Sequence, residues 1–129
     1  MCGGERMEVG SVGWLDLTVE NAEDVRDFYK SVVGFQSSDV DMDGYSDFVM
    51  LAPGSGEGIG GVCHARGGNK DIPPQWILYF IVENVEESVK TCESLGGKAL
   101  VGPKEMGDAT YCVIRDPAGA VCALYNPGS

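Results

Sequence analysis

Residues 12–19 alternate between two kinds of side chain, and this period of two predicts a β-strand whose faces meet different environments. One face carries Leu15, Leu17 and Val19, and the other carries Trp14, Asp16 and Thr18. The next apolar residues recur with the helical period, at Val25, Phe28, Tyr29 and Val32. A strand followed by an amphipathic helix is therefore predicted.

The ends of this helix carry recognisable signals. Asn21 is a favourable N-cap, and Asp24 stands at the position of the acid in a capping box. Gly34 is placed to end the helix. Beyond it, residues 35–65 read as three strands, with turns predicted at Asp43-Gly44 and at residues 53–58.

The same pattern returns 63 residues later, where VENAED at 19–24 becomes VENVEE at 82–87. A strand is predicted over residues 77–82, and Asn84 with Glu87 repeats the N-cap signal. The apolar stripe of the second helix is Val85, Val89, Cys92 and Leu95, before Gly96-Gly97. Three strands are predicted near residues 98–101, 110–115 and 120–125, with a turn at residues 116–119.

Each half is therefore a βαβββ unit, and the fold class is α+β with two tandem units. One domain is predicted over residues 8–127. It comprises unit one at 12–65, a Gly- and Pro-rich linker at 66–75, and unit two at 76–127. Residues 1–7 carry no pattern and are predicted to be disordered or weakly ordered.

Composition places the chain among soluble globular proteins, with 43% hydrophobic and 22% charged residues in 129. No apolar run approaches the roughly 20 residues of a transmembrane helix, and no signal peptide is evident, so a cytoplasmic protein is expected. The five cysteines are odd in number and lack CxxC spacing, which favours reduced thiols over a disulfide framework.

The net charge of −11 argues against nucleic acid as a partner, because phosphate binding needs a basic patch. Residues 1–64 hold 12 acidic and 3 basic side chains, whereas residues 65–129 hold 8 and 6. The acidic half could attract cationic ligands. An excess of carboxylates that serves solubility alone is the other interpretation.

The duplicated βαβββ unit, the VEN helix entry and the closing RDPAGAVCALYNP at residues 115–127 resemble the vicinal oxygen chelate superfamily. This group contains glyoxalase I, extradiol dioxygenases and bleomycin resistance proteins. The resemblance implies curved mixed sheets around a cavity and a homodimer. It also implies a divalent metal held by His, Gln or Glu from the first and last strand of each unit.

Carried over one at a time, those ligand positions fall on Trp14, Ile77, Ala123 and a residue near Gly60. None of these side chains can coordinate a metal, since such ions need carboxylate, imidazole or thiolate ligands. No metal and no other cofactor is therefore expected at the family position.

An aromatic, mostly apolar lining remains on the cavity side, and it suits a small organic molecule, planar or cationic. Strand parity assigns to that side Trp14, Asp16, Thr18, Ile77, Tyr79 and Ile81 from the first strands, and Gly60, Val62, His64, Val121, Ala123 and Tyr125 from the last strands. Seven of these are the predicted ligand-binding residues: Trp14, Asp16, Thr18, His64, Ile77, Tyr79 and Tyr125. The alternative is that Trp14 and Tyr79 only fill the sheet interface.

Three of these side chains are candidates for acid or base chemistry. Asp16 interrupts an apolar strand, Tyr79 is its repeat mate, and His64 is the only histidine. Cys63 adjoins His64, but neighbouring strand residues point to opposite faces, so the two do not form a nucleophile and base pair. Two functions stay open: a ligand-binding protein with a degenerate metal site, or a lyase, isomerase or dioxygenase with a displaced metal or acid/base site.

Overall fold

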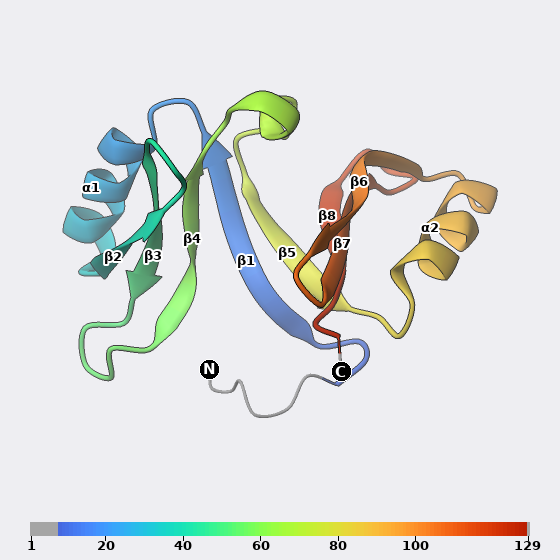
Figure 1. The fold of residues 1–129 in the computed structure, drawn as a ribbon, viewed down its shortest axis with the longest axis horizontal. Helices are drawn as coiled ribbons and strands as arrows, with labels where there is room; N and C mark the ends of the chain where they lie inside the picture. The colour runs from blue at the N-terminus through green and yellow to red at the C-terminus, as the bar shows by residue number, and fades with distance from the viewer. Residues whose placement is uncertain (1–7, 129) are drawn as a thin grey trace. The chain divides into compact units, whose positions relative to one another are not determined.

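Both predicted βαβββ units are present in the structure, a computed structural model that describes residues 8–128 (Figure 1). The first unit comprises Leu15–Trp76, and the second comprises residues 8–14 together with 77–128. The prediction made for residues 1–7 lies outside the described residues. Neither helix in the described part of the chain is long and apolar enough to cross a membrane.

The first unit is a four-stranded mixed sheet with one helix, in the strand order β2-β3-β4-β1. β1 runs parallel to β4, and the other neighbours are antiparallel. Its elements are β1 (Val12–Val19), α1 (Ala22–Val33), β2 (Gln36–Asp41), β3 (Ser46–Leu51) and β4 (Gly58–His64). A short 3₁₀ turn, η1 (Gly67–Asn69), follows in the segment predicted as linker.

The second unit repeats this arrangement in the order β5-β8-β7-β6, with β5 parallel to β8. Its elements are β5 (Trp76–Ile81), α2 (Val85–Ser94), β6 (Lys98–Met106), β7 (Ala109–Arg115) and β8 (Val121–Asn126). β6 is longer than the predicted 98–101, because Pro103 falls in a register shift between Val101 and Lys104 and does not end the strand. Such irregularities are where a sheet tolerates proline.

The beginning of the chain takes part in the second unit. The Gly10 N–H donates to the Ile81 carbonyl at 2.8 Å, and the Ile81 N–H donates to the Ser11 carbonyl at 2.9 Å. These bonds extend the strand pairing of β5 into residues that precede β1 in the sequence. The residues of β1 up to Trp14 therefore belong to the second unit, and those from Leu15 belong to the first.

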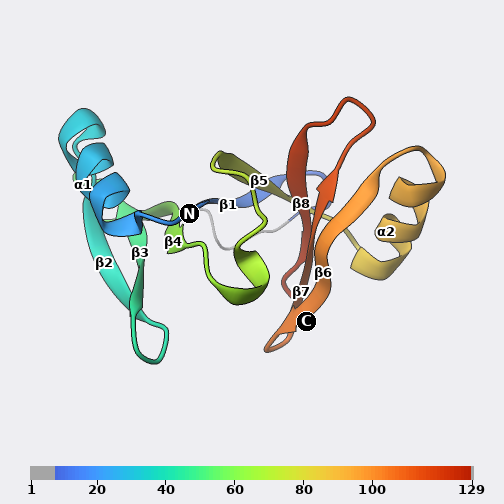
Figure 2. The ribbon, with the colours of Figure 1, turned by 90° about the horizontal axis from the view of Figure 1, so that it is seen from above.

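In each unit the helix covers one face of the sheet (Figure 2). Under α1 the buried core contains Leu17, Val19, Ala22, Phe48, Met50 and Val62, with Val25 and Tyr29 packed against it. Under α2 it contains Val85, Val89, Cys112 and Ile114. Burial of these side chains accounts for the larger part of the stability of each unit.

Some residues of the predicted apolar stripes are exposed. In α1, Phe28 and Val32 are 55% and 63% exposed, so only Val25 and Tyr29 of that stripe pack on the core. In α2, Leu95 is also exposed, while Val85 and Val89 are buried. The predicted stripes were therefore wider than the faces that each sheet covers.

The two helices begin differently. The Asn84 side chain accepts a hydrogen bond from the Glu87 N–H at 2.9 Å, as predicted for an N-cap. Asn21 also occupies the predicted N-cap position of α1, but its side chain makes no capping hydrogen bond within the described structure. The backbone of Asn21, with φ −101° and ψ 57°, differs from the extended conformation that Asn84 adopts.

The turns follow the predicted chemistry. Asp43 and Gly44 both have positive φ, 64° and 106°, as the two central residues of a type I′ hairpin turn require. In the second unit the Asp116 carboxylate accepts hydrogen bonds from the Ala118 and Ala120 N–H groups, at 2.8 and 2.9 Å. This closes the turn at residues 116–119 and fixes the register of β7 against β8.

Candidate functional site

The sheet face opposite α1 carries Asp16, and the register of β1 identifies its neighbours. Asp16 pairs with Gly61 and Thr18 pairs with Cys63, so Gly61 and Cys63 share this face. Val62 and His64 pair with Leu17 and Val19 on the helix side. The parity predicted for β4 is therefore wrong by one residue: Gly60, Val62 and His64 do not lie on the face of Asp16.

In the second unit the corresponding face carries three tyrosines. Tyr79 pairs with Ala123, and Tyr125 lies on the same face and pairs with Tyr111 of β7. The Tyr79 ring centroid lies 6.2 Å from that of Tyr125 and 6.3 Å from that of Tyr111. We call Tyr79, Tyr111 and Tyr125 the tyrosine face.

Tyr79 and Tyr125 were predicted to line the site, whereas Tyr111 was not. The turn at residues 116–119 contained the missing signal, because a tight turn fixes which residues oppose each other. Counting outward from it places Arg115 opposite Val121 and Tyr111 opposite Tyr125, as observed.

The first unit carries different side chains at the positions of the tyrosines. Asp16 pairs with Gly61 as Tyr79 pairs with Ala123. Phe48 pairs with Val62 in antiparallel strands, so the preceding residue, Asp47, lies opposite Cys63. In the second unit Tyr111 lies opposite Tyr125 in the same way. We call Asp16, Asp47 and Cys63 the acid–thiol face.

Cys63 is held as a neutral thiol on this face. Burial is the largest cause that raises its pKa, followed by the negative charges of Asp16 and Asp47 and a hydrogen bond from the thiol to Asp47. A thiol needs the opposite surroundings, positive charge or a helix N-terminus, to act as a nucleophile. The acid–thiol face is therefore not a site of thiolate chemistry.

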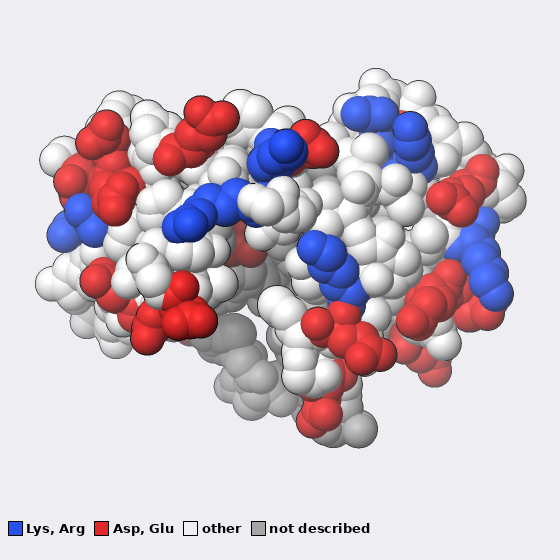
Figure 3. Space-filling model, turned by 45° about the horizontal axis from the view of Figure 1, so that its top comes forward, with Lys and Arg blue, Asp and Glu red and all other residues white. Residues whose placement is uncertain are grey.

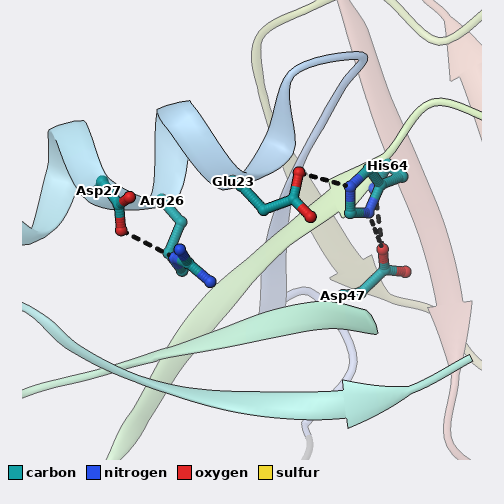
Figure 4. Close-up of polar contacts among 5 residues, drawn as sticks. All are labelled: Glu23, Arg26, Asp27, Asp47 and His64. Atoms are coloured by element: carbon teal, nitrogen blue, oxygen red, sulfur yellow. Dashed lines mark hydrogen bonds and ion pairs between the residues drawn. The ribbon is translucent and has the colours of Figure 1, made fainter. Parts of the chain in front are cut away.

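His64 lies between two carboxylates on the helix side of the first unit (Figure 4). Its Nδ1 is 3.1 Å from Asp47 Oδ1, and its Nε2 is 3.4 Å from Glu23 Oε1. Asp47 Oδ1 also accepts the His64 backbone N–H at 2.9 Å. The imidazole is 12% exposed and meets the Tyr45 ring edge-on at a centroid distance of 5.4 Å.

These contacts explain His64 as a residue that ties β4 to β3 and to the first turn of α1. Both ring nitrogens face carboxylates of the protein, and the ring lies on the opposite side of the sheet from Asp16. Asp16 and His64 therefore do not form an acid–base pair. The candidate catalytic residues are not assembled into one catalytic group within the first unit.

The other predicted site residues differ in access. Thr18 and Ile77 are buried, with 5% and 2% of their surface exposed. Trp14 and Tyr79 are half-buried and engage other groups of the protein. A half-buried aromatic ring can contact a ligand with its exposed part while its buried part stays packed against the protein.

The family metal positions do not fit a metal ion. Trp14, Ile77 and Ala123 offer no ligand atom, and the register makes Gly61 the partner of Asp16 as Ala123 is of Tyr79. A Cβ built on Gly61 would collide with Asp16 Oδ1, so the carboxylate occupies the space of a side chain there. Within residues 8–128, no three His, Cys, Asp or Glu side chains are arranged to hold a metal.

Charge and thiols complete the description of the surface and core. Acidic side chains gather in several patches on the face shown in Figure 3, with basic ones between them. The described cysteines, Cys63, Cys92, Cys112 and Cys122, are free thiols, as predicted. Burial raises the pKa of Cys112 to about 11, so this thiol too stays protonated at neutral pH.

The match to relatives in sequence covers most of this chain but less than half of each relative. The "Anthracycline biosynthesis protein DnrV" of Streptomyces peucetius is 29% identical over 114 residues, which cover 86% of this chain and 39% of that protein. The "Putative glyoxylase CFP32" of Mycobacterium tuberculosis is 27% identical over 119 residues, or 91% and 46%. The chain thus spans about half the length of these curated relatives or less.

Solved structures share the fold at low identity. Methylmalonyl-CoA epimerase from Mycobacterium tuberculosis covers 96% of this chain with a TM-score of 0.52 and 14% identity. It is matched over 94% of its own length. A Bacillus halodurans protein covers 95% with a TM-score of 0.60 and 11% identity, over 97% of its own chain.

A family model matches residues 11–124, almost the whole of the two repeats. The match agrees with the element order, with the parallel pairing of first and last strands in both units, and with the shared fold of the solved structures. The chain belongs to the Glyoxalase/Bleomycin resistance protein/Dioxygenase superfamily.

Proposed function

We propose that this protein binds a planar, cationic organic molecule on the tyrosine face of the second unit, without a catalytic metal. One observation carries the proposal. Three half-buried tyrosines lie around Ala123, the position on which the resemblance to the family places the metal ligand of the last strand. The proposed site thus offers aromatic rings at that position in place of a metal-binding carboxylate.

Tyrosine rings favour such a ligand for two reasons. Each ring presents a flat apolar surface that can stack on another ring, and its π face attracts cations. The Tyr79 ring is tilted by 41° to Tyr111 and by 79° to Tyr125, so the three rings present differently oriented surfaces. An inserted planar molecule could stack on one ring and meet the edge of another.

Charge and relatives support the same ligand class. The net charge of −11 raises the local concentration of cations. The name of DnrV associates that relative with anthracyclines, which are planar ring systems that carry an amino sugar. The bleomycin resistance proteins in the family name likewise concern a cationic natural product.

The test is a titration of the protein with the anthracycline daunorubicin, followed by the fluorescence anisotropy of the compound. We expect saturable binding by the wild-type chain. Tyr79→Ala should weaken it about tenfold or more, since an aromatic contact of this kind contributes roughly 1–3 kcal/mol. Tyr79→Phe keeps the ring and should stay within about threefold of wild type.

Tyr45→Ala is the matched control, because this half-buried tyrosine lies in the first unit against His64 and Arg66. It should leave the affinity unchanged. Absence of saturable binding by wild type, or equal effects of the Tyr79 and Tyr45 variants, would remove the basis of the proposal. Circular dichroism of each variant confirms that the fold is kept.

A lyase, isomerase or dioxygenase with a displaced metal or acid/base site is the second candidate, and one observation favours it: His64 is oriented by the Asp47 carboxylate at 3.1 Å. An aspartate that holds an imidazole in this way is a recurrent arrangement in catalysis. Metal analysis of the purified protein tests the metal-dependent form of this candidate. Stoichiometric metal, or a large stabilisation by one divalent cation in thermal melts, would favour the enzyme.

A further inference from the structure

A cavity of about 290 Å³ lies under the C-terminal half of α1. All of its lining residues belong to the first unit. The walls that matter are Leu15 of β1, Tyr29 and Val33 of α1, Met50 of β3, Ile59 of β4 and Trp76 at the start of β5. Leu15 points to the helix side of the sheet, so the cavity is separate from the acid–thiol face.

The chemistry of the walls excludes most ligand classes. The lining is made of aliphatic and aromatic side chains, and no charged residue contributes to it. A charged ligand would lose its hydration here without gaining a partner, which costs several kcal/mol or more. The occupant must therefore be neutral and largely apolar.

The volume of the cavity limits the size of the ligand. An apolar cavity of about 150 Å³ is known to hold one benzene ring, in another protein. The cavity under α1 has a volume of about 290 Å³, close to twice that value. A molecule of two fused rings matches this space, and the rings of Tyr29 and Trp76 would contact it.

The polar atoms of the two aromatic wall residues bond each other. The Trp76 Nε1–H donates to the Tyr29 hydroxyl at 3.1 Å, and the two rings meet edge-on with centroids 5.3 Å apart. The lining presents almost no polar surface to the cavity, so an apolar ligand leaves no polar group of the wall unpaired.

The mouth of the cavity is open to ligands. Val33 is 54% exposed and Ile59 is 38% exposed, although both also line the cavity. Met50, in contrast, is fully buried at its floor. The cavity thus runs from an apolar entrance on the surface to the core of the first unit.

From these observations we propose that the cavity under α1 is a second ligand site. It takes a neutral, compact, apolar molecule of two fused rings, which contacts the rings of Tyr29 and Trp76. The ligand differs in charge and size from the one proposed for the tyrosine face. The two sites share no residue.

Coumarin is the probe, because it is a neutral molecule of two fused rings. Titration calorimetry and backbone amide NMR of the full chain should show saturable 1:1 binding, with shifts centred on Val33, Ile59 and Trp76. Val33→Trp fills the entrance and should weaken binding at least tenfold. Val32→Trp is the matched control, since Val32 is 63% exposed on the same turn and does not line the cavity.

The proposal is overturned by any of three results in the binding experiments. These are no saturable binding of coumarin at 1 mM, equal effects of the Val33 and Val32 variants, or amide shifts centred on Tyr111 instead of Val33. Concentration-dependent dimerisation that Val33→Trp abolishes would also overturn it, because a second copy would then cover the entrance.

Discussion

The two units bury similar cores under their helices and differ on the opposite face of each sheet. Asp16, Asp47 and Cys63 stand in the first unit where Tyr79, Tyr111 and Tyr125 stand in the second. On the same face, Gly61 of β4 likewise corresponds to Ala123 of β8. One duplicated scaffold thus presents a charged, glycine-lined face and an aromatic one.

The difference shows which positions the fold constrains. Side chains between helix and sheet must fill a fixed volume, so both units use apolar residues there, with Phe48 and Met50 in the first unit and Cys112 in the second. Side chains on the other face are not held by that requirement and can diverge with function. The opposite faces are therefore the places to look for ligand chemistry in both halves.

Adding a methyl group to β4 should have the largest effect on stability. A Cβ at Gly60 would lie 2.6 Å from the Leu15 carbonyl oxygen and 2.9 Å from Leu15 Cδ1. Because the backbone cannot easily move, Gly60→Ala should lower the free energy of unfolding by about 3 kcal/mol in urea denaturation.

The neighbouring glycine provides the control for this experiment. A Cβ at Gly61 would meet only the end of the Asp16 side chain, which can rotate away. Gly61→Ala should therefore cost only about 1 kcal/mol. Equal losses for the two variants would mean that β1 and β4 are less closely packed than described.

The acids around His64 provide the second test. Asp47→Ala removes the acceptor of the His64 N–H and of the Cys63 thiol, and should cost about 2 kcal/mol of unfolding free energy. Glu23→Ala, in which the side chain lost is 65% exposed, should change it by less than about 0.5 kcal/mol. A larger loss for Glu23→Ala would reverse the assignment of Asp47 as the structural partner.

The helix starts provide the smallest contrast. Asn84→Ala removes a capping bond and should lower the free energy of unfolding by about 1 kcal/mol. Asn21→Ala removes no such bond, so its effect should stay below about 0.3 kcal/mol. Similar melting temperatures for the two variants in calorimetry would show that the first helix is capped in solution.

The sequence predicts the element order well because periodicity, glycine placement and the Asp-Gly turn are local signals. It fails for β4, where the repeat offset is 63 residues at the first strands but 62 at the last: Asp16 matches Tyr79 and Gly61 matches Ala123. A single extra residue reverses the face of every later side chain in a strand. His64 was therefore assigned to the wrong side.

The cavity under α1 was beyond sequence analysis for a different reason. It depends on the hydrogen bond from Trp76 to Tyr29, a residue that lies 47 positions earlier in the chain. No local pattern specifies such a contact, and the sequence predicts only that Trp76 is the first residue of the second unit. Tertiary packing alone brings it into the first.

The hydrogen bonds of Gly10 and Ser11 with Ile81 have a consequence for synthesis on the ribosome. Translation proceeds from the N-terminus, and domains fold as their segments emerge. Every strand pair of the first unit can form once residue 76 has emerged. Residues 10 and 11 cannot pair until β5 has also emerged. A nascent chain stalled just after residue 76 has left the ribosome would therefore carry a paired first unit and an unpaired segment at residues 10 and 11, which limited proteolysis of stalled complexes can detect.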